Sequence, residues 1–154
     1  MYATILWATD GSRDADVALG EARRLLEANG HLIAFHCDQR FGGSRVGGIP
    51  FFADESDRIE QITRRVEELR SDGLDVDFVV ERTTNGVGPA IAAEAKRSRA
   101  DVIVCGTRSL GHLPDIFGGS SAAAVVKHAS VPVVVVPLDA PRHADAASIE
   151  GAPI

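Results

Sequence analysis

Residues 106–121, GTRSLGHLPDIFGGSS, are of the types best suited to holding an anion. Glycines leave backbone amides open to a ligand, serine hydroxyls add donors, and the N-terminus of a following helix favours negative charge. The residues concerned are Gly106, Gly111, Gly118, Gly119, Ser120 and Ser121. The pattern indicates a phosphate site. It is equally compatible with a flexible loop that ends in an N-cap serine, and spacing alone leaves both interpretations open.

Other nucleotide-binding motifs are missing from the sequence. It contains no GxxxxGK[ST] P-loop. The turn after the first predicted strand, TDGSRDA, has neither GxGxxG nor the Gly-Gly pair of PP-loop enzymes. The sequence therefore argues against a P-loop protein and against a dinucleotide bound in the Rossmann manner.

Catalytic residues are sparse in the same segment. Hydrolysis of a nucleotide needs a positioned water or base and a cation that stabilises developing charge. Within residues 106–121, Arg108 is the only arginine or lysine and Asp115 is the only carboxylate. His112 lies in the same loop and is a candidate for contact with a γ-phosphate. Because these residues form no recognisable catalytic set, we expect a binding protein, not an enzyme, with at most slow turnover.

Polar residues also follow two other predicted strands. Asp10 begins the sequence DGS, and Cys37 is the centre of the sequence HCD. Asp10 is a suitable helix cap, and that simpler role stays open. Cys37 and Cys105 are expected to be buried, inert thiols at strand ends, because free cysteine packs as a small apolar residue. His36 is expected to be a structural histidine.

Short apolar runs alternate with amphipathic stretches, and these elements must position the polar residues. We expect strands at residues 3–9, 31–37, 74–82, 101–105 and 131–136. We expect a first helix that begins after Ser12 and is stopped by Gly30. Further helices are expected from about residue 59 to 72, at 89–99 and at 120–128, with a loop at 38–54.

The resulting order of strands and helices predicts an α/β fold, with a parallel sheet covered by helices on both faces. In open sheets of this kind, ligands bind outside the carboxyl ends of the strands. Residues 1–139 are expected to form one domain. The tail at 140–154 is rich in alanine, proline and small polar residues, and is expected to be disordered or to serve as a dimer arm.

Charge, apolar runs and cysteine content indicate which binding partners and which cellular location to expect. The formal net charge is −6 and acidic and basic residues are interleaved, which argues against nucleic acid and against an anionic membrane surface. No apolar run is long enough to span a bilayer, and the N-terminus lacks the features of a signal peptide. Two cysteines do not make a disulfide scaffold, so we expect a reducing, cytoplasmic location.

From residue 2 to 138 the sequence resembles the universal stress protein family. The resemblance rests on Asp10-Gly11-Ser12, on Gly88-Pro89 and on the closing GTRS…GGSS…VKHASVPVVVVP. The ATP-binding branch of that family has the pattern G-x2-G-x9-G-[S/T]. Gly106, Gly119 and Ser120 match it here, and Ser109 replaces the second glycine. If that position requires a positive φ, a side chain there costs roughly 1 kcal/mol.

The resemblance implies a Rossmann-like fold of the adenine nucleotide alpha hydrolase type, with five parallel strands in the order 3-2-1-4-5. It implies ATP as ligand, or AMP or another adenine nucleotide, with Mg²⁺ held through the phosphates. It places Ala8, Thr9 and Asp10 at the adenine and ribose, backbone groups of Cys37 at the adenine edge, and Cys105 near the base. It also implies that the ribose and phosphates are contacted by Gly106, Arg108, Ser109, Gly119, Ser120 and Ser121.

The resemblance also implies a homodimer formed through the last strand and a regulatory role in the stress response. Two alternatives stay open. One is an interaction or dimerisation module with a vestigial, empty pocket, in which Ser109 marks lost binding. The other is a slow ATPase.

Overall fold

Five parallel strands form the central sheet, in the order β5-β2-β1-β6-β7. The computed structural model describes residues 1–39, 45–46, 49–50, 55–83, 85–107 and 121–137. The sheet consists of β1 (Tyr2–Ala8), β2 (Leu26–Gln39), β5 (Asp75–Thr83), β6 (Val102–Gly106) and β7 (Val133–Val136). Counted along the chain, these five strands lie in the order 3-2-1-4-5, so the predicted sheet topology is confirmed.

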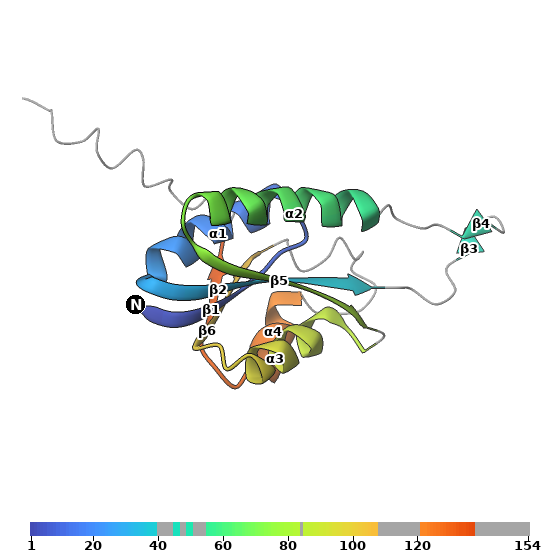
Figure 1. Cartoon of the computed structure of the whole chain (residues 1–154). Helices are drawn as coiled ribbons and strands as arrows, with labels where there is room; N and C mark the ends of the chain where they lie inside the picture. Colours follow the sequence, from blue (N-terminus) through green and yellow to red (C-terminus); the bar gives the residue numbers. More distant parts are fainter. Residues whose placement is uncertain (40–44, 47–48, 51–54, 84, 108–120, 138–154) are drawn as a thin grey trace, which may run out of the picture.

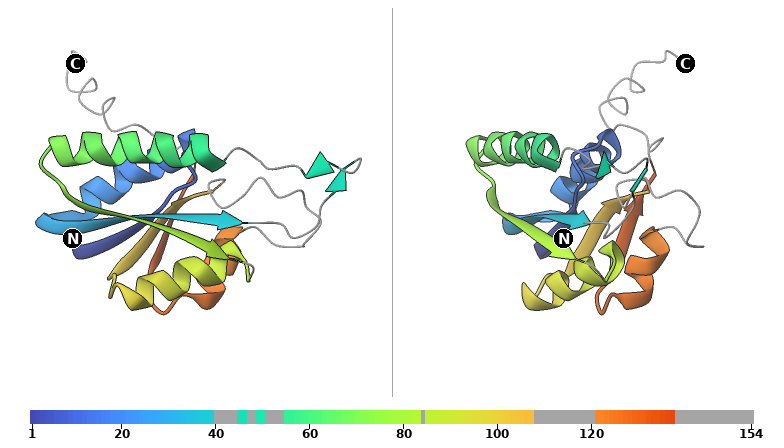
Figure 2. Two further views of the ribbon diagram at one scale, coloured as in Figure 1. Left: turned by 45° about the vertical axis from the view of Figure 1, so that its right-hand side comes forward. Right: turned by 90° about the vertical axis from the view of Figure 1, so that its right-hand side faces the viewer.

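Helices cover both faces of this sheet, as predicted. They are α1 (Arg13–Leu25), α2 (Glu55–Ser71), α3 (Val87–Arg97) and α4 (Ser121–His128). α1 and α2 lie on one face, and α3 and α4 lie on the other (Figure 1, Figure 2). Each face has its own apolar core, with Trp7 and Ile62 in the first and Phe35 and Ile91 in the second. None of the described helices is long and apolar enough to cross a membrane.

The sequence explains the central strands directly. All five residues of β6, VIVCG, are buried, as expected for a parallel strand with helices on both sides. In α1 the buried residues Ala15, Ala18, Leu19 and Ala22 recur at helical spacing and face the sheet. Pro89 lies in the first turn of α3, where its missing amide hydrogen costs no helical bond.

The boundary between α1 and β2 differs from the prediction. α1 ends at Leu25, and Leu26 already has an extended backbone (φ −74°, ψ 137°) and pairs with Tyr2 of β1. Gly30 does not stop a helix but lies within β2. A Cβ atom there would fall 2.7 Å from Cδ1 of Leu26 and 3.0 Å from the carbonyl oxygen of Ala3, so a larger residue would force the Leu26 side chain to move. Leu25 is helical as predicted, whereas Leu26 is apolar because it packs against the core from the start of β2.

The segment predicted as a loop at 38–54 contains the end of β2 and two short antiparallel strands. These are β3 (Arg45–Val46) and β4 (Ile49–Pro50).

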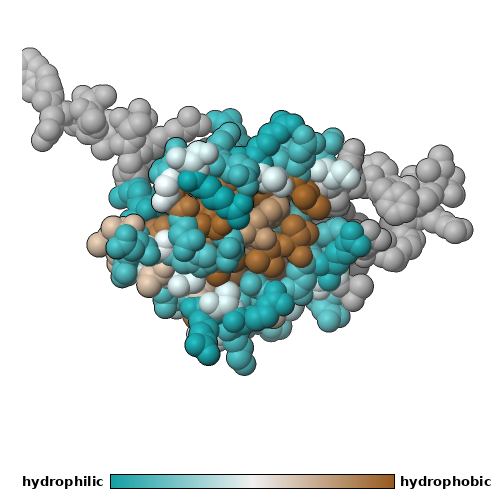
Figure 3. All heavy atoms as spheres, in the orientation of Figure 1, coloured by the Kyte–Doolittle hydropathy of each residue, from teal (hydrophilic) through white to brown (hydrophobic). Residues whose placement is uncertain are grey.

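At the opposite side of the molecule from β7, β5 is an edge strand of the main sheet. Apolar side chains gather over β5 between α2 and α3 (Figure 3), and Val80 of this strand is exposed.

Candidate functional site

The carboxyl ends of β1 and β6 meet at the centre of the sheet. β1 pairs with β2 on one side and with β6 on the other, and Ala8 lies opposite both Phe35 and Cys105. The chain leaves β1 toward α1 on one face and leaves β6 on the way to α4 on the other face (Figure 2). This is the switch point at which open α/β sheets bind ligands. The topology therefore brings Asp10 and Gly106 to the same edge.

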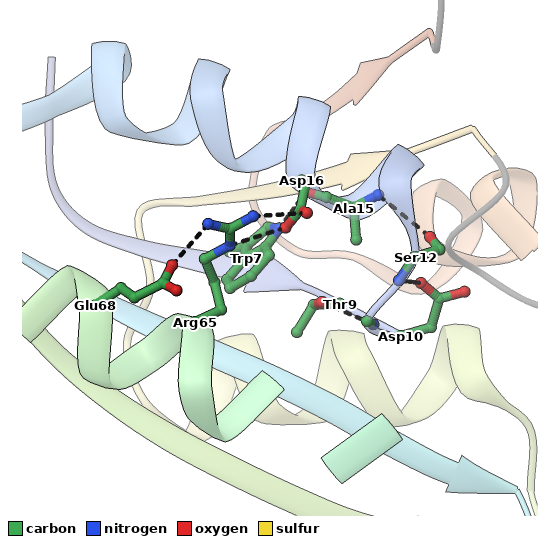
Figure 4. Close-up of polar contacts among 9 residues, drawn as sticks. Trp7, Thr9, Asp10, Ser12, Ala15, Asp16, Arg65 and Glu68 are labelled. Carbon is green, nitrogen blue, oxygen red and sulfur yellow. Dashed lines mark hydrogen bonds and ion pairs between the residues drawn. The ribbon is translucent and has the colours of Figure 1, made fainter. Parts of the chain in front are cut away.

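A run of short polar contacts shapes the turn between β1 and α1 (Figure 4). The Gly11 amide donates to Oγ1 of Thr9 at 3.2 Å, and the Ser12 amide donates to Oδ1 of Asp10 at 2.9 Å. Gly11 has a φ of 77°, which favours glycine. The Ala15 amide donates to Oγ of Ser12 at 3.3 Å, so Ser12 is the N-cap of α1. The simpler alternative, in which Asp10 is only the cap of this helix, is therefore excluded.

Two contacts fix α1 behind this turn (Figure 4). Nε1 of the buried Trp7 donates to the carbonyl oxygen of Ala15 at 2.9 Å. Arg65 of α2 binds both carboxylate oxygens of Asp16, at 3.2 and 2.8 Å, and Oε2 of Glu68 at 2.8 Å. The hydrogen bond to Asp16 is the main cause that raises the pKa of Arg65. The first turn of α1 is therefore fixed by Trp7 of the sheet and by Arg65 of α2.

The end of β2 contributes a buried histidine. His36 is buried, and its Nδ1 lies 2.9 Å from the carbonyl oxygen of Thr9, which confirms its structural character. Cys37 follows and is half-buried, so it is less enclosed than predicted. Asp38 is buried and pairs with the exposed Arg82 at 3.5 Å.

The end of β6 is closed and apolar. Cys105 is fully buried, and burial raises the pKa of its thiol to about 11. This agrees with the expectation of an inert thiol, since the thiolate is the reactive form. Gly106 is buried at the end of the strand, and the amide of Thr107 donates to the carbonyl oxygen of Val136 at 3.1 Å.

The phosphate half of the predicted site is described only at its two borders. Gly106 ends β6, and Ser121 is the first residue of α4. Arg108, Ser109, Gly119 and Ser120 lie outside the described residues. Because α4 precedes the parallel strand β7, its N-terminus lies at the carboxyl edge of the sheet, on the same edge as Asp10.

Two carboxylates near this edge had no signal in the sequence. In the sequence, Asp38 stands out only as the residue after Cys37. Asp14 lies in the first turn of α1, is buried, and has one oxygen without a hydrogen-bond partner among the described residues. The partial positive charge of the helix N-terminus stabilises a carboxylate in this position. Within the described part of the chain, no three histidine, cysteine or acidic side chains are placed to hold a metal ion.

A surface hollow of about 500 Å³ lies at the opposite edge of the sheet. Its lining includes Arg23, Leu26, Gly30, Asp72 and Leu74, which come from the C-terminal ends of helices and the starts of strands. Helix C-termini carry partial negative charge and repel phosphate. The hollow is therefore a poor site for a nucleotide, and the carboxyl edge stays the candidate.

Known proteins share this sequence and this fold. The family model described as the universal stress protein family matches residues 1–137. A Thermus aquaticus protein described as a universal stress protein is 31% identical over 141 residues, which cover 88% of this chain and 99% of that protein.

Solved structures resemble the fold at lower identity. A universal stress protein in complex with cAMP superposes with a TM-score of 0.64 at 20% identity, covering 90% of this chain and 98% of the other. A universal stress protein family member from Arabidopsis thaliana with AMP bound gives a TM-score of 0.59 at 17% identity, covering 88% of this chain and 91% of the other. The match to the family model and the Thermus relative settle the assignment: this chain belongs to the universal stress protein family.

Proposed function

We propose that this protein binds an adenine nucleotide at the carboxyl edge of the sheet, with ATP as the first candidate. The observation that carries the proposal is the switch point itself, where the Thr9–Ser12 turn after β1 lies at the same edge as Gly106 and the start of α4. Family members with cAMP or AMP bound support an adenine nucleotide in general.

In this proposal the base and ribose lie over the end of β1. Ala8 borders them from the end of β1, and Thr9 and Asp10 border them from the turn that follows, with backbone groups of Cys37 at the adenine edge. Cys105 lies beneath the base as a fully buried, uncharged thiol and belongs to the apolar core under the pocket. Asp10 keeps one carboxylate oxygen bonded to the Ser12 amide, which presets the orientation of its carboxylate toward a ribose hydroxyl.

The phosphates lie between the end of β6 and the start of α4. Gly106 borders them at the end of β6. The backbone amide of Gly119, the hydroxyls of Ser109, Ser120 and Ser121, and the guanidinium of Arg108 are the proposed donors. The N-terminus of α4 adds partial positive charge. Mg²⁺ is held through the phosphates, which is its usual mode of binding next to nucleotides.

The proposed role is regulatory and not catalytic. Among the described residues no group of three side chains is placed to hold a metal ion, and Arg108 is the only arginine or lysine in residues 106–121. Occupancy by nucleotide then changes the protein's partners or conformation under stress. A homodimer through β7 accompanies this role, because β7 is an edge strand with half-buried valines at 133–135.

The first experiment is acid extraction of the purified protein with chromatographic identification of any released nucleotide. Thermal unfolding with millimolar ATP-Mg, AMP and cAMP then ranks the ligands. A ligand present at 100 times its Kd stabilises the folded state by about 2.7 kcal/mol, which a melting curve resolves. Absence of bound nucleotide together with unchanged melting temperatures for all three ligands would contradict the proposal.

Gly119→Val tests where the phosphates lie. The added side chain is expected to block backbone approach to the phosphates, so affinity falls while the fold is kept. Gly20→Val is the matched control, because Gly20 lies in α1 with no neighbouring atom within 4 Å of an added Cβ. Unchanged affinity in Gly119→Val would move the phosphate site elsewhere.

Ser109→Gly separates an active pocket from a vestigial one. Ser109 is the observation that favours the alternative of an interaction module with an empty pocket. A large gain in affinity in Ser109→Gly would mean that the serine impairs the site. Little change, or a loss, would mean that the site accommodates it.

A further inference from the structure

The buried ring of His36 lies beside the proposed base and ribose pocket. The register between β1 and β2 ends with Ala8 opposite Phe35. One residue later, the amide of Thr9 donates to the carbonyl oxygen of Phe35 at 2.9 Å. The carbonyl oxygen of Thr9 accepts from Nδ1 of His36, also at 2.9 Å. Thr9 is therefore tied to β2 through both of its backbone polar groups, one of them through a side chain.

The chemistry of this contact fixes one proton. A carbonyl oxygen only accepts hydrogen bonds, so Nδ1 of His36 must carry the hydrogen. His36 is 2% exposed and Thr9 is 4% exposed, which keeps competing water away from the bond. Breaking it would leave a buried polar group without that partner, which is costly.

The position of Thr9 determines the position of Asp10. Oγ1 of Thr9 accepts from the Gly11 amide, and Oδ1 of Asp10 accepts from the Ser12 amide. The turn is thus anchored at Thr9 by His36 and at Ser12 by the helix cap. Between these anchors, a shift of Thr9 would carry the Asp10 carboxylate with it.

We propose that His36 is a positioning residue for the nucleotide site. Its Nδ1–H group holds the Thr9 carbonyl and thereby presents Asp10 to the ribose. This inference rests on the proposed function, and it assigns His36 no contact with the nucleotide.

The chain offers a matched histidine for comparison. His31 lies on the same strand as His36, near the amino end of β2 and away from the carboxyl edge of the sheet. Its two ring nitrogens contact the exposed carboxylates of Asp75 and Asp77, at 2.9 and 3.2 Å. His31 therefore shares the strand and the residue type with His36 but contacts no residue of the proposed site.

The test compares His36→Asn with His36→Gln. Asparagine places its amide nitrogen where Nδ1 of histidine lies, whereas glutamine places it near Nε2. His36→Asn is expected to bind the best nucleotide of the earlier ranking as tightly as the unchanged protein. His36→Gln is expected to bind about tenfold more weakly, which corresponds to the loss of one hydrogen bond. His31→Asn is expected to leave affinity unchanged.

Two readouts keep the inference separate from overall stability and from the proposed function. ¹⁵N NMR of the ring nitrogens, recorded on the unchanged protein without nucleotide, is expected to find Nδ1 protonated. Amide shifts of Asp10 and Ser12 are expected to change in His36→Gln and to stay close to native in His36→Asn.

The inference would be overturned by an unprotonated Nδ1, by equal affinities of the two amide variants, or by tenfold weaker binding in His36→Asn. If His36→Gln does not fold, ¹⁵N NMR of the unchanged protein still decides whether Nδ1 donates to Thr9, and weaker binding by His36→Asn still overturns the inference. If the unchanged protein binds no adenine nucleotide, the proposed function fails. The ring protonation and the amide shifts then still report whether His36 holds the turn.

Discussion

The two helix pairs that cover the sheet are held together in different ways. On one face, α1 and α2 are joined across their surface by Arg65, which bridges Asp16 and Glu68 (Figure 4). The space beneath them is filled by large side chains such as Trp7 and Ile62. These contacts are made by flexible or bulky side chains.

On the other face, α3 and α4 approach at the level of the backbone. A Cβ atom on Gly88 of α3 would lie 2.6 Å from Cβ of Ala124, 2.8 Å from its carbonyl carbon and 3.0 Å from the amide nitrogen of Val125. Two of these three atoms belong to the backbone of α4. The contact therefore leaves α4 no freedom to adjust by moving a side chain.

This difference matters for the candidate site. The turn after β1 is positioned by hydrogen bonds, at His36 and Ser12, whereas α4 is positioned by steric contact of its middle, at Ala124 and Val125, with α3. Substitutions on the α3–α4 face should therefore be the more damaging, and the three predictions below test that comparison in order of decreasing effect.

Gly88→Val should cause the largest loss of stability. The new side chain must displace the backbone of α4, and overpacking of this kind costs about 3 kcal/mol. Urea denaturation measures the free energy of unfolding. Gly20→Val on α1 is the control and should be close to neutral, since its side chain would enter open space. If Gly88→Val lowers the free energy of unfolding by less than about 1 kcal/mol, the backbone of α4 can move aside at little cost. The claim that steric contact with α3 fixes α4 would then be wrong.

Alkaline pH should weaken the α3–α4 face through Cys105. Its thiol has a pKa of about 11 in the folded protein, above the ordinary value of 9.0, because it is buried among apolar side chains. Folding favours the protonated thiol. The stabilisation is therefore complete below pH 9 and is lost as pH rises toward 11, by roughly 2–3 kcal/mol.

Cys105→Ala removes this titration. The free energy of unfolding of the unchanged protein, relative to Cys105→Ala, should therefore fall between pH 9 and pH 11. Cys37→Ala is the matched control, because its thiol is only half-buried. Parallel pH profiles for the unchanged protein and Cys105→Ala would show that burial of Cys105 does not oppose ionisation.

Arg65→Met should have the smallest effect. The ion pairs of Arg65 with Asp16 and Glu68 are 40% or more exposed at each side chain, so solvent screening limits their contribution to about 1 kcal/mol or less. The difference should shrink further in 1 M salt, where the screening length is about 3 Å. Arg64→Met is the control, because Arg64 pairs with Glu60 within α2 alone. A loss equal to that of Gly88→Val would contradict the contrast between the faces.

Local patterns were enough to place most elements. The apolar run at 101–105 predicts β6 within one residue, and Pro89 correctly marks the first turn of α3. The pattern misplaced the end of α1, because Leu26 is apolar for a tertiary reason: it packs against Gly30 and pairs with β1. The short strands β3 and β4 were missed, since two residues each are too few to create a period.

The site divides in the same way. Glycine and serine spacing in residues 106–121 predicts a phosphate segment, and that prediction stays untested because most of the segment lies outside the described residues. The sequence left open whether Asp10 only caps the first helix, since aspartate is a common N-cap residue. The backbone conformation of Ser12 and its contact with the Ala15 amide decided it.

By itself, the sequence determined the alternation of strands and helices and, through its resemblance to the family, the strand order. Hydrophobic periodicity and motif spacing are local properties that can be recognised in the sequence alone. Only the tertiary structure decided that His36 holds Thr9 and that Gly88 admits α4. Both contacts join residues far apart in the chain, and they depend on the relative placement of whole elements, which no local pattern encodes.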